Sequence, residues 1–434
     1  MNSADQYDLP LEVIVLLIYG TFMCLFGVLL HWIFAGALPY APDSMYGLSL
    51  VLIAFQIVTL GRTPFGDLRR SWTLVAIGIG TAVIGMVGSF VPGHFSGTLR
   101  VLVGLLMTGG GAALLYQYAA RADQARAWLK GPGILRVLAF SAASVYLLTL
   151  IAGLLTLLPG ITKGPHTAIL LIIYGISFLS LAWTLHEVGK AYGPETIHAR
   201  PTQVSPPGHL RDAHRRLSRD AQLPLTVAII LLQAVLLTLL GILLFPVGVG
   251  LLPFSPDGQH GLTLVITAIQ IIALGSTPVG EYRRSWLMVL FGMLFAALGI
   301  FSSIVPGVIT GQTGLLLGLL NLVGGFLGLF RGLLSMLRRR RNPGAQQADA
   351  VPPILRLLAL IPTMIAVVQI VFGLSIFLPT LLPAKVGAAM LVVNGLLLFA
   401  LAGMVLKLSR LGKDPAAASA AAPTPAAAPR ASDR

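Results

Sequence analysis

Charged residues are scarce in this chain of 434 residues, at 10% of the total, and the acidic ones are the scarcer, with 15 Asp and Glu against 29 Lys and Arg. Water-soluble domains are usually about 25% charged, so a soluble globular enzyme is excluded. The single cysteine, Cys24, excludes an intrachain disulfide and any multi-cysteine metal or iron–sulfur site. Because no catalytic constellation stands out either, we expect no enzymatic activity, no cofactor and no metal.

Long hydrophobic runs are abundant instead, since 56% of the residues are hydrophobic. About 20 apolar residues cross the hydrocarbon core of a bilayer. We therefore expect an all-α, polytopic membrane protein with about 12 transmembrane helices, of which those at 46–61 and 260–275 are short for a span. The apolar segments are 13–35, 46–61, 72–91, 99–119, 134–158, 167–188, 225–245, 260–275, 286–305, 312–335, 354–378 and 385–408.

The positions of the basic residues predict the orientation of the chain. Of the 29 Lys and Arg, 26 lie in or beside connections on one side, and only Arg100, Lys163 and Lys385 lie on the other. Cytoplasmic loops carry the excess of basic residues, so both termini are expected in the cytoplasm. The net charge of +14 then indicates anionic lipid headgroups at the cytoplasmic face, and not nucleic acid, as the partner. Self-association or assembly into a membrane complex stays open.

An internal repeat is the strongest signal in the sequence. Residues 38–93 align without a gap with residues 252–307, at an offset of 214, and 28 of the 56 positions are identical. The register resumes at an offset of 220 where residues 131–136 align with 351–356. Each copy holds six segments, an even number, so we expect two parallel six-helix repeats. The expected domains are a first repeat (1–188), a cytoplasmic linker (189–223), a second repeat (224–410) and a disordered Ala/Pro-rich tail (411–434).

The repeat duplicates a polar connection between its second and third segments. Thr-Pro suits the start of a short interfacial helix, the arginine pair would lie at headgroup depth, and the tryptophan would anchor the next span. One interpretation is a topological anchor, and the other is an interdomain latch or a site for an anionic ligand. The residues are Thr63, Pro64, Asp67, Arg69, Arg70 and Trp72 in one copy and Thr277, Pro278, Glu281, Arg283, Arg284 and Trp286 in the other.

Amides are the polar groups that remain inside the apolar segments, because all 15 carboxylates fall in loops, tails or segment ends. A buried proton-relay carboxylate is therefore not expected. Gln56 and Gln270 are matched by the repeat, and interhelical hydrogen bonding is the ordinary use of such residues, with contact to a substrate as the alternative. The other amides are Gln117, Gln233, Asn321, Gln369 and Asn394.

Several predicted hairpins share one form, in which a span with spaced glycines leads through a Pro-Gly turn into a second glycine-containing span. The glycines and turns are Gly78, Gly85, Pro92-Gly93, Gly104 and Gly109 to Gly111 in one copy, and Gly292, Gly299, Pro306-Gly307, Gly318 and Gly324-Gly325 in the other. This form resembles the HdeD-like acid-resistance membrane proteins, as a tandem pair. The resemblance implies a bacterial inner-membrane protein with a non-enzymatic role in envelope or acid-stress tolerance.

A second resemblance is to the major facilitator superfamily, which also has twelve spans in two parallel halves and a basic signature in two matched loops. It implies a secondary transporter or permease, here for a neutral or hydrophobic solute because no charge lies inside a span. A scaffold subunit of a larger membrane complex is the third hypothesis. The loop residues that match the superfamily signature are Gly61, Asp67, Arg69 and Arg70, and Gly275, Glu281, Arg283 and Arg284.

Overall fold

The computed structural model describes residues 10–59, 72–93, 95–120, 126, 128–131, 133–158, 160, 164–192, 225–273, 276–277, 280–281, 286–341, 353–378 and 380–411. Within these ranges, twelve long helices coincide with the twelve apolar segments of the sequence. The helices are α1 (Leu11–Phe34), α2 (Pro42–Thr59), α3 (Trp72–Phe90), α4 (Ser96–Ala120), α6 (Gly133–Leu157), α7 (Gly164–Tyr192), α10 (Leu225–Gly248), α11 (Pro256–Ala273), α12 (Trp286–Ile304), α13 (Thr310–Arg341), α14 (Pro353–Phe377) and α15 (Ala384–Leu411). The strands are β1 (Ser276–Thr277) and β2 (Gly280–Glu281).

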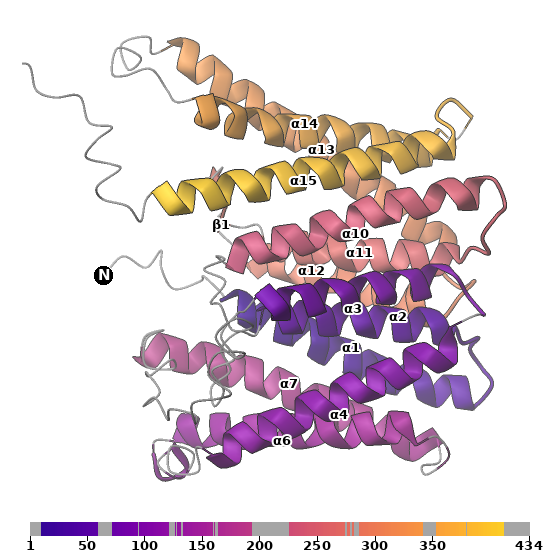
Figure 1. Cartoon of the computed structure of the whole chain (residues 1–434), viewed down its shortest axis with the longest axis vertical. Helices are drawn as coiled ribbons and strands as arrows, with labels where there is room; N and C mark the ends of the chain where they lie inside the picture. Colours follow the sequence, from indigo (N-terminus) through magenta and orange to yellow (C-terminus); the bar gives the residue numbers. More distant parts are fainter. Residues whose placement is uncertain are drawn as a thin grey trace, which may run out of the picture.

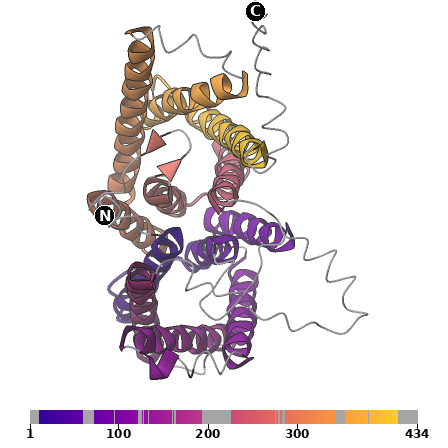
Figure 2. The same cartoon turned by 90° about the vertical axis from the view of Figure 1, so that its left-hand side faces the viewer.

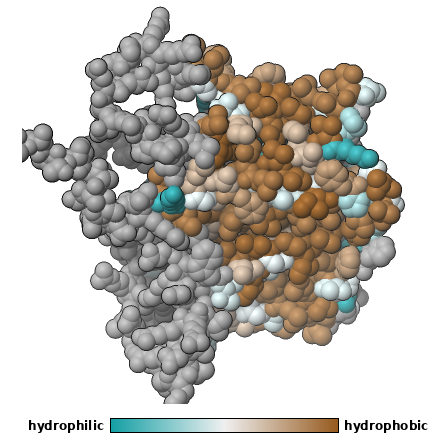
Figure 3. Space-filling view, turned by 45° about the horizontal axis from the view of Figure 1, so that its top comes forward, coloured by the Kyte–Doolittle hydropathy of each residue, from teal (hydrophilic) through white to brown (hydrophobic). Residues whose placement is uncertain are grey.

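Nine of the described helices are long and apolar enough to cross a membrane. They are α1, α3, α4, α6, α7, α10, α13, α14 and α15. Figure 3 shows a surface on which hydrophobic residues cover most of the described helices, as lipid contact requires. The chain therefore fits a multi-pass helical membrane protein. Helix α7 continues to Tyr192, four residues into the segment expected as a linker, and the rest of that segment lies outside the described residues.

The helices pack as antiparallel neighbours in matching pairs. In the first half of the chain α1 packs against α7, α2 against α3 and α4 against α6. In the second half α10 packs against α15, α11 against α12 and α13 against α14. Figure 1 shows the two halves one above the other, with α1, α2, α3, α10, α11 and α12 in the middle, and Figure 2 gives the view turned by 90°.

Glycines allow the paired helices to approach closely, and their contacts recur in both halves. A Cβ added at Gly27 would lie 2.7 Å from the carbonyl oxygen of Ala168, and one added at Gly241 would lie 2.6 Å from that of Ala388. Gly27 and Gly241 are 214 residues apart, whereas Ala168 and Ala388 are 220 apart, as in the sequence repeat. Matching contacts are made by Gly47 and Gly261, by Gly85 and Gly299, and by Gly111 and Gly325.

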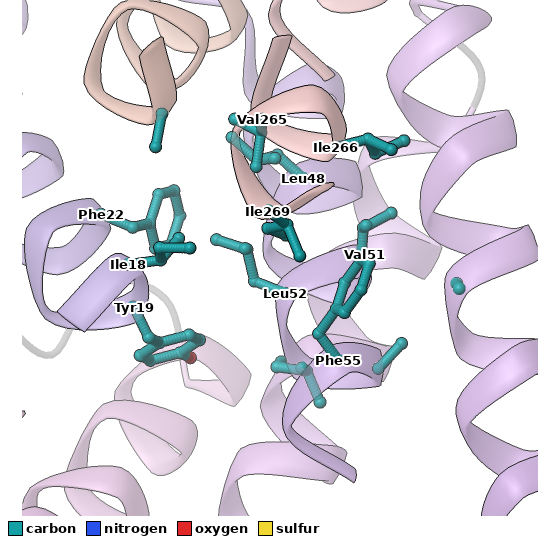
Figure 4. Close-up of a cluster of buried hydrophobic side chains, with 14 of the residues drawn as sticks. Ile18, Tyr19, Phe22, Leu48, Val51, Leu52, Phe55, Val265, Ile266 and Ile269 are labelled. Carbon is teal, nitrogen blue, oxygen red and sulfur yellow. The ribbon is translucent and has the colours of Figure 1, made fainter. Parts of the chain in front are cut away.

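Apolar side chains fill the contact between the two halves. Ile18 and Phe22 of α1, Leu52 of α2 and Ile269 of α11 lie in one cluster in Figure 4, and all four are buried. Val265 of α11 lies beside them and has no exposed surface. Large aliphatic and aromatic side chains are among the residues most often buried in protein interiors. The centre of the molecule is therefore a packed hydrophobic core shared by both halves.

Two backbone hydrogen bonds also join the halves, near the ends of α3 and α12. The N–H of Ala41 donates to the carbonyl of Ile304 across 3.0 Å, and the N–H of Ser255 donates to the carbonyl of Phe90 across 3.3 Å. Each donor and each acceptor is 214 residues from its counterpart, so the two bonds are reciprocal. They lie on the face formed by the connections 35–41, 91–93, 249–255 and 305–309, which we call the turn face.

Candidate functional site

The duplicated polar connection lies mostly outside the described residues. Trp72 begins α3 and Trp286 begins α12, so each tryptophan stands at the start of a helix. Thr277 lies in β1 and Glu281 in β2. The predicted residues outside the described ranges are Thr63, Pro64, Asp67, Arg69 and Arg70 of the first copy, and Pro278, Arg283 and Arg284 of the second.

The second copy of this connection forms an antiparallel pair of strands, and the expected interfacial helix starting at Thr277 is wrong. Ser276 pairs with Glu281, and Thr277 pairs with Gly280. A residue that precedes proline is biased toward an extended backbone. Proline at the second position and glycine at the fourth are typical of a β-turn, and residues 277–280 have this pattern. The extended backbone favoured before proline therefore outweighs the helix-capping signal of Thr-Pro at Thr277.

Gln56 and Gln270, the amides matched by the repeat, lie near the ends of α2 and α11, and both are half-buried. The side-chain nitrogen of Gln56 is buried and has no hydrogen-bond partner among the described residues. This nitrogen therefore donates no interhelical hydrogen bond to the described part of the chain. A buried amide nitrogen without a partner is free to donate a hydrogen bond to a bound molecule.

Two acidic residues on the turn face have a structural role that sequence reasoning missed. Asp43 and Asp257 lie in the first turns of α2 and α11 and are only 5% and 7% exposed. The Oδ2 atom of Asp257 accepts the backbone N–H of Gly307 at 3.1 Å, and Oδ2 of Asp43 accepts that of Gly93. Both glycines have positive φ, 88° at Gly93 and 82° at Gly307. The carboxylates therefore hold tight turns closed. The sequence signal for this role was that the same acidic residue recurs at an offset of 214.

Polar groups next to these turns differ between the halves. Tyr46 and Arg100 in the first half correspond to His260 and Gly314 in the second. A Cβ at Gly314 would lie 3.1 Å from Cε1 of His260, so the glycine leaves room for the imidazole.

Burial raises the pKa of the Tyr40 phenol, which keeps it neutral. Among the described residues no three His, Cys, Asp or Glu side chains gather as a metal site would need.

A second polar cluster lies inside the first half, between α1, α6 and α7. The hydroxyl of Thr149 is 2.6 Å from that of Tyr174, and each can donate to the other. The ring of Tyr19 packs edge-on to Tyr174, with ring centroids 6.4 Å apart. Phe178 lies within 4.8 Å of both tyrosine rings, measured between centroids. The two hydroxyls therefore satisfy each other beside a group of packed aromatic rings.

The positions equivalent to this cluster in the second half carry amides. Gln233 corresponds to Tyr19 at an offset of 214, and Gln369 and Asn394 correspond to Thr149 and Tyr174 at an offset of 220. Gln233 has no exposed surface, and neither its amide nitrogen nor its amide oxygen has a hydrogen-bond partner among the described residues. The Oδ1 atom of Asn394 is likewise buried and unpartnered within the described part of the chain.

Sequence reasoning recognised these three amides but left them unmatched. The repeat is detectable by identity only over 38–93 and around 131–136, and neither stretch includes Tyr19, Thr149 or Tyr174. The matching glycine contacts place the remaining helices in register.

Comparisons of the chain with models of protein families, with curated proteins and with solved structures found no match. The resemblances to the HdeD-like proteins and to the major facilitator superfamily therefore stay predictions.

Proposed function

We propose that the chain is a non-enzymatic, twelve-span protein of the bacterial inner membrane that supports tolerance of envelope or acid stress. In this proposal two parallel six-helix units, 1–188 and 224–410, form one rigid body with both termini in the cytoplasm. The role in stress tolerance and the location in the bacterial inner membrane are implied by the resemblance to the HdeD-like proteins. The packing between the two halves supports the part of the proposal that the protein does not transport a solute.

The observation that carries the proposal is the contact between the two halves. An alternating-access transporter opens a path by rocking one half against the other around a site near the midplane. Here that contact is filled by buried side chains such as Phe22, Leu52 and Ile269, and it is closed on the turn face by the Ala41 and Ser255 hydrogen bonds. Separating the halves would expose this core and break both bonds. A fixed body is therefore favoured.

The twelve-span arrangement is supported by α2, α11 and α12 together with the nine apolar helices. At 18 or 19 residues, these three helices are about 27–29 Å long at the usual 1.5 Å per residue. That is close to the hydrocarbon thickness of about 30 Å. Leu48 and Leu262, in the short helices α2 and α11, have no exposed surface, as expected where protein and not lipid surrounds a span.

Deletion and cross-linking together test the proposal. A strain lacking the protein should survive low pH less well, and the wild-type chain should restore survival. Ala41→Cys with Ile304→Cys, in a Cys24→Ala background, would join the halves on the turn face by a disulfide. For a rigid body, survival should be the same with the disulfide formed or reduced. The single-cysteine variants serve as controls.

Two results would contradict this proposal. If deletion left survival at low pH unchanged and abolished the uptake or export of a solute, the stress role would be lost. If the cross-linked chain failed and regained activity on reduction, the halves would have to move.

A secondary transporter or permease for a neutral solute is the second candidate. The buried, unpartnered amides of Gln56 and Gln233 favour it, because polar groups inside a membrane protein often mark a path. Replacing Gln56 and Gln270 together by leucine should then abolish transport, whereas a rigid body would be indifferent to the change.

A further inference from the structure

We propose that Gln233, Gln369 and Asn394 form a buried binding site for a small uncharged molecule that both donates and accepts hydrogen bonds. The site lies within the second half, between α10, α14 and α15, and not between the halves. It requires neither transport nor a stress role, so it stands apart from the proposed function.

The equivalence of the two clusters rests on helix packing. A Cβ at Gly175 of α7 would touch Cys24 of α1, and one at Gly395 of α15 would touch Thr238 of α10. The offsets are 220 for the glycines and 214 for their neighbours. Helices α1 and α7 therefore cross in the same register as α10 and α15. The contacts of Gly111 with Leu150 and of Gly325 with Ile370 extend this register to α6 and α14.

In the first half these positions are filled and satisfied. Thr149 and Tyr174 share a hydrogen bond, and Tyr19 has rings on several sides, with Phe22 at 6.0 Å and Phe178 at 4.8 Å between centroids. Neither hydroxyl of this pair is left without a hydrogen-bond partner. The first half therefore shows how the same helix arrangement looks when its own side chains occupy the space.

In the second half four of these five positions carry smaller side chains, the exception being Gln369 in place of Thr149, and two of the amides have unsatisfied atoms. Leu236 and Leu398 stand where the first half has Phe22 and Phe178, and both leucines are buried. The amides of Gln233 and Asn394 present one donor and two acceptor atoms that are buried and without a partner among the described residues. An unpaired buried polar group is strongly unfavourable where no water reaches it. A bound molecule that pairs with these atoms removes that penalty.

The chemistry of the surrounding helices defines the class of ligand. Helix α10 has no charged residue, and in α14 the only charge, Arg356, is in its first turn. In α15 the charges are Lys385 at one end and Lys407 and Arg410 at the other, all more than two helical turns from Asn394. An ion would find no counter-charge there. Carboxamides offer both N–H donors and C=O acceptors, which suits a small neutral amide or alcohol.

The native cysteine gives a matched test, because Cys24 occupies the position equivalent to Thr238. The wild-type chain carries its thiol against Gly175, the residue after Tyr174, and the double variant Cys24→Thr, Thr238→Cys carries it against Gly395, the residue after Asn394. Both proteins, purified in nanodiscs, are treated with methyl methanethiolsulfonate, and modification is followed by mass spectrometry. Acetamide, which donates and accepts, is compared with N,N-dimethylacetamide, which only accepts, as a competitor.

The double variant should react about tenfold faster than the wild-type chain, because the reactive thiolate forms only where polar molecules enter. Acetamide should slow this reaction and N,N-dimethylacetamide should not. Adding Gln233→Tyr, Gln369→Thr and Asn394→Tyr, the set found in the first half, should remove both effects. Equal reaction rates at the two positions would overturn the proposal, and so would fast labelling that acetamide leaves unchanged, which indicates water alone. The two-protein comparison decides the matter even if the filled variant does not fold.

Discussion

Asp257 accepts two hydrogen bonds, from the backbone N–H of Gly307 at 3.1 Å and from the hydroxyl of Thr310 at 2.5 Å. Its counterpart Asp43 accepts the N–H of Gly93, but its Oδ1 atom has no partner among the described residues. Ser96 stands at the position equivalent to Thr310. One half therefore holds its turn with two bonds to the carboxylate, and the other with one.

Thr310→Val should lower the free energy of unfolding by about 1–3 kcal/mol, because it leaves a buried carboxylate oxygen unpaired. Ser96→Ala should change it little, since Asp43 has no bond to lose there. Equilibrium unfolding of the purified protein in sodium dodecyl sulfate measures both. Equal losses in the two variants would show that the second bond contributes nothing.

Gly93→Ala and Gly307→Ala should each destabilise the protein by about 1–2 kcal/mol, because a side chain is strained at positive φ. Gly97 and Gly311 are the matched controls, since they lie in the helices that follow and a Cβ at either would meet nothing within 4 Å. Alanine there should be neutral or stabilise by up to about 1 kcal/mol. The same unfolding assay separates the two pairs, and a similar loss at all four sites would contradict the role of the turns.

Gln56→Leu should raise the free energy of unfolding by about 1 kcal/mol, because it removes a buried amide nitrogen that has no partner. Ser49→Ala in the same helix is the control, since that hydroxyl donates to the carbonyl of Met45 at 2.8 Å and its loss should not stabilise. A clear destabilisation by Gln56→Leu would instead support the interhelical hydrogen bond predicted from the sequence.

The predicted orientation is open to test with two exposed residues near opposite faces. His166 lies in the first turn of α7 on the turn face, and Arg136 lies in the first turn of α6 at the opposite face. In a Cys24→Ser background, His166→Cys should react with a membrane-impermeant maleimide in intact cells, and Arg136→Cys only after permeabilisation. The reverse pattern would place both termini outside.

The positions of the helices could be predicted from the sequence because apolar length is a local property. The prediction is weakest where burial and not hydropathy fixes a boundary. The segment expected at 260–275 is the helix Pro256–Ala273, which begins earlier with a proline and an acidic residue, both typical of a helix start. Its polar first turn is buried by the neighbouring turn, which no hydropathy window detects.

The candidate site was less predictable, for a different physical reason. Gln56 and Gln270 are identical in the two copies and were found, whereas Tyr19 and Gln233 share neither chemistry nor size. Their equivalence depends on the backbone crossing of α1 with α7 and of α10 with α15, which the glycine contacts define. The two residues therefore occupy equivalent positions in the two halves although they are not similar residues.

The reciprocal bonds from Ala41 and Ser255 also bear on how each half can vary. Contacts of this kind are isologous, the kind that a symmetric homodimer makes with itself. In a homodimer every substitution appears twice, so a phenol could not be exchanged for an amide on one side alone. Joining both partners in a single chain removes that constraint, and one half can keep a hydrogen-bonded aromatic cluster while the other carries amides.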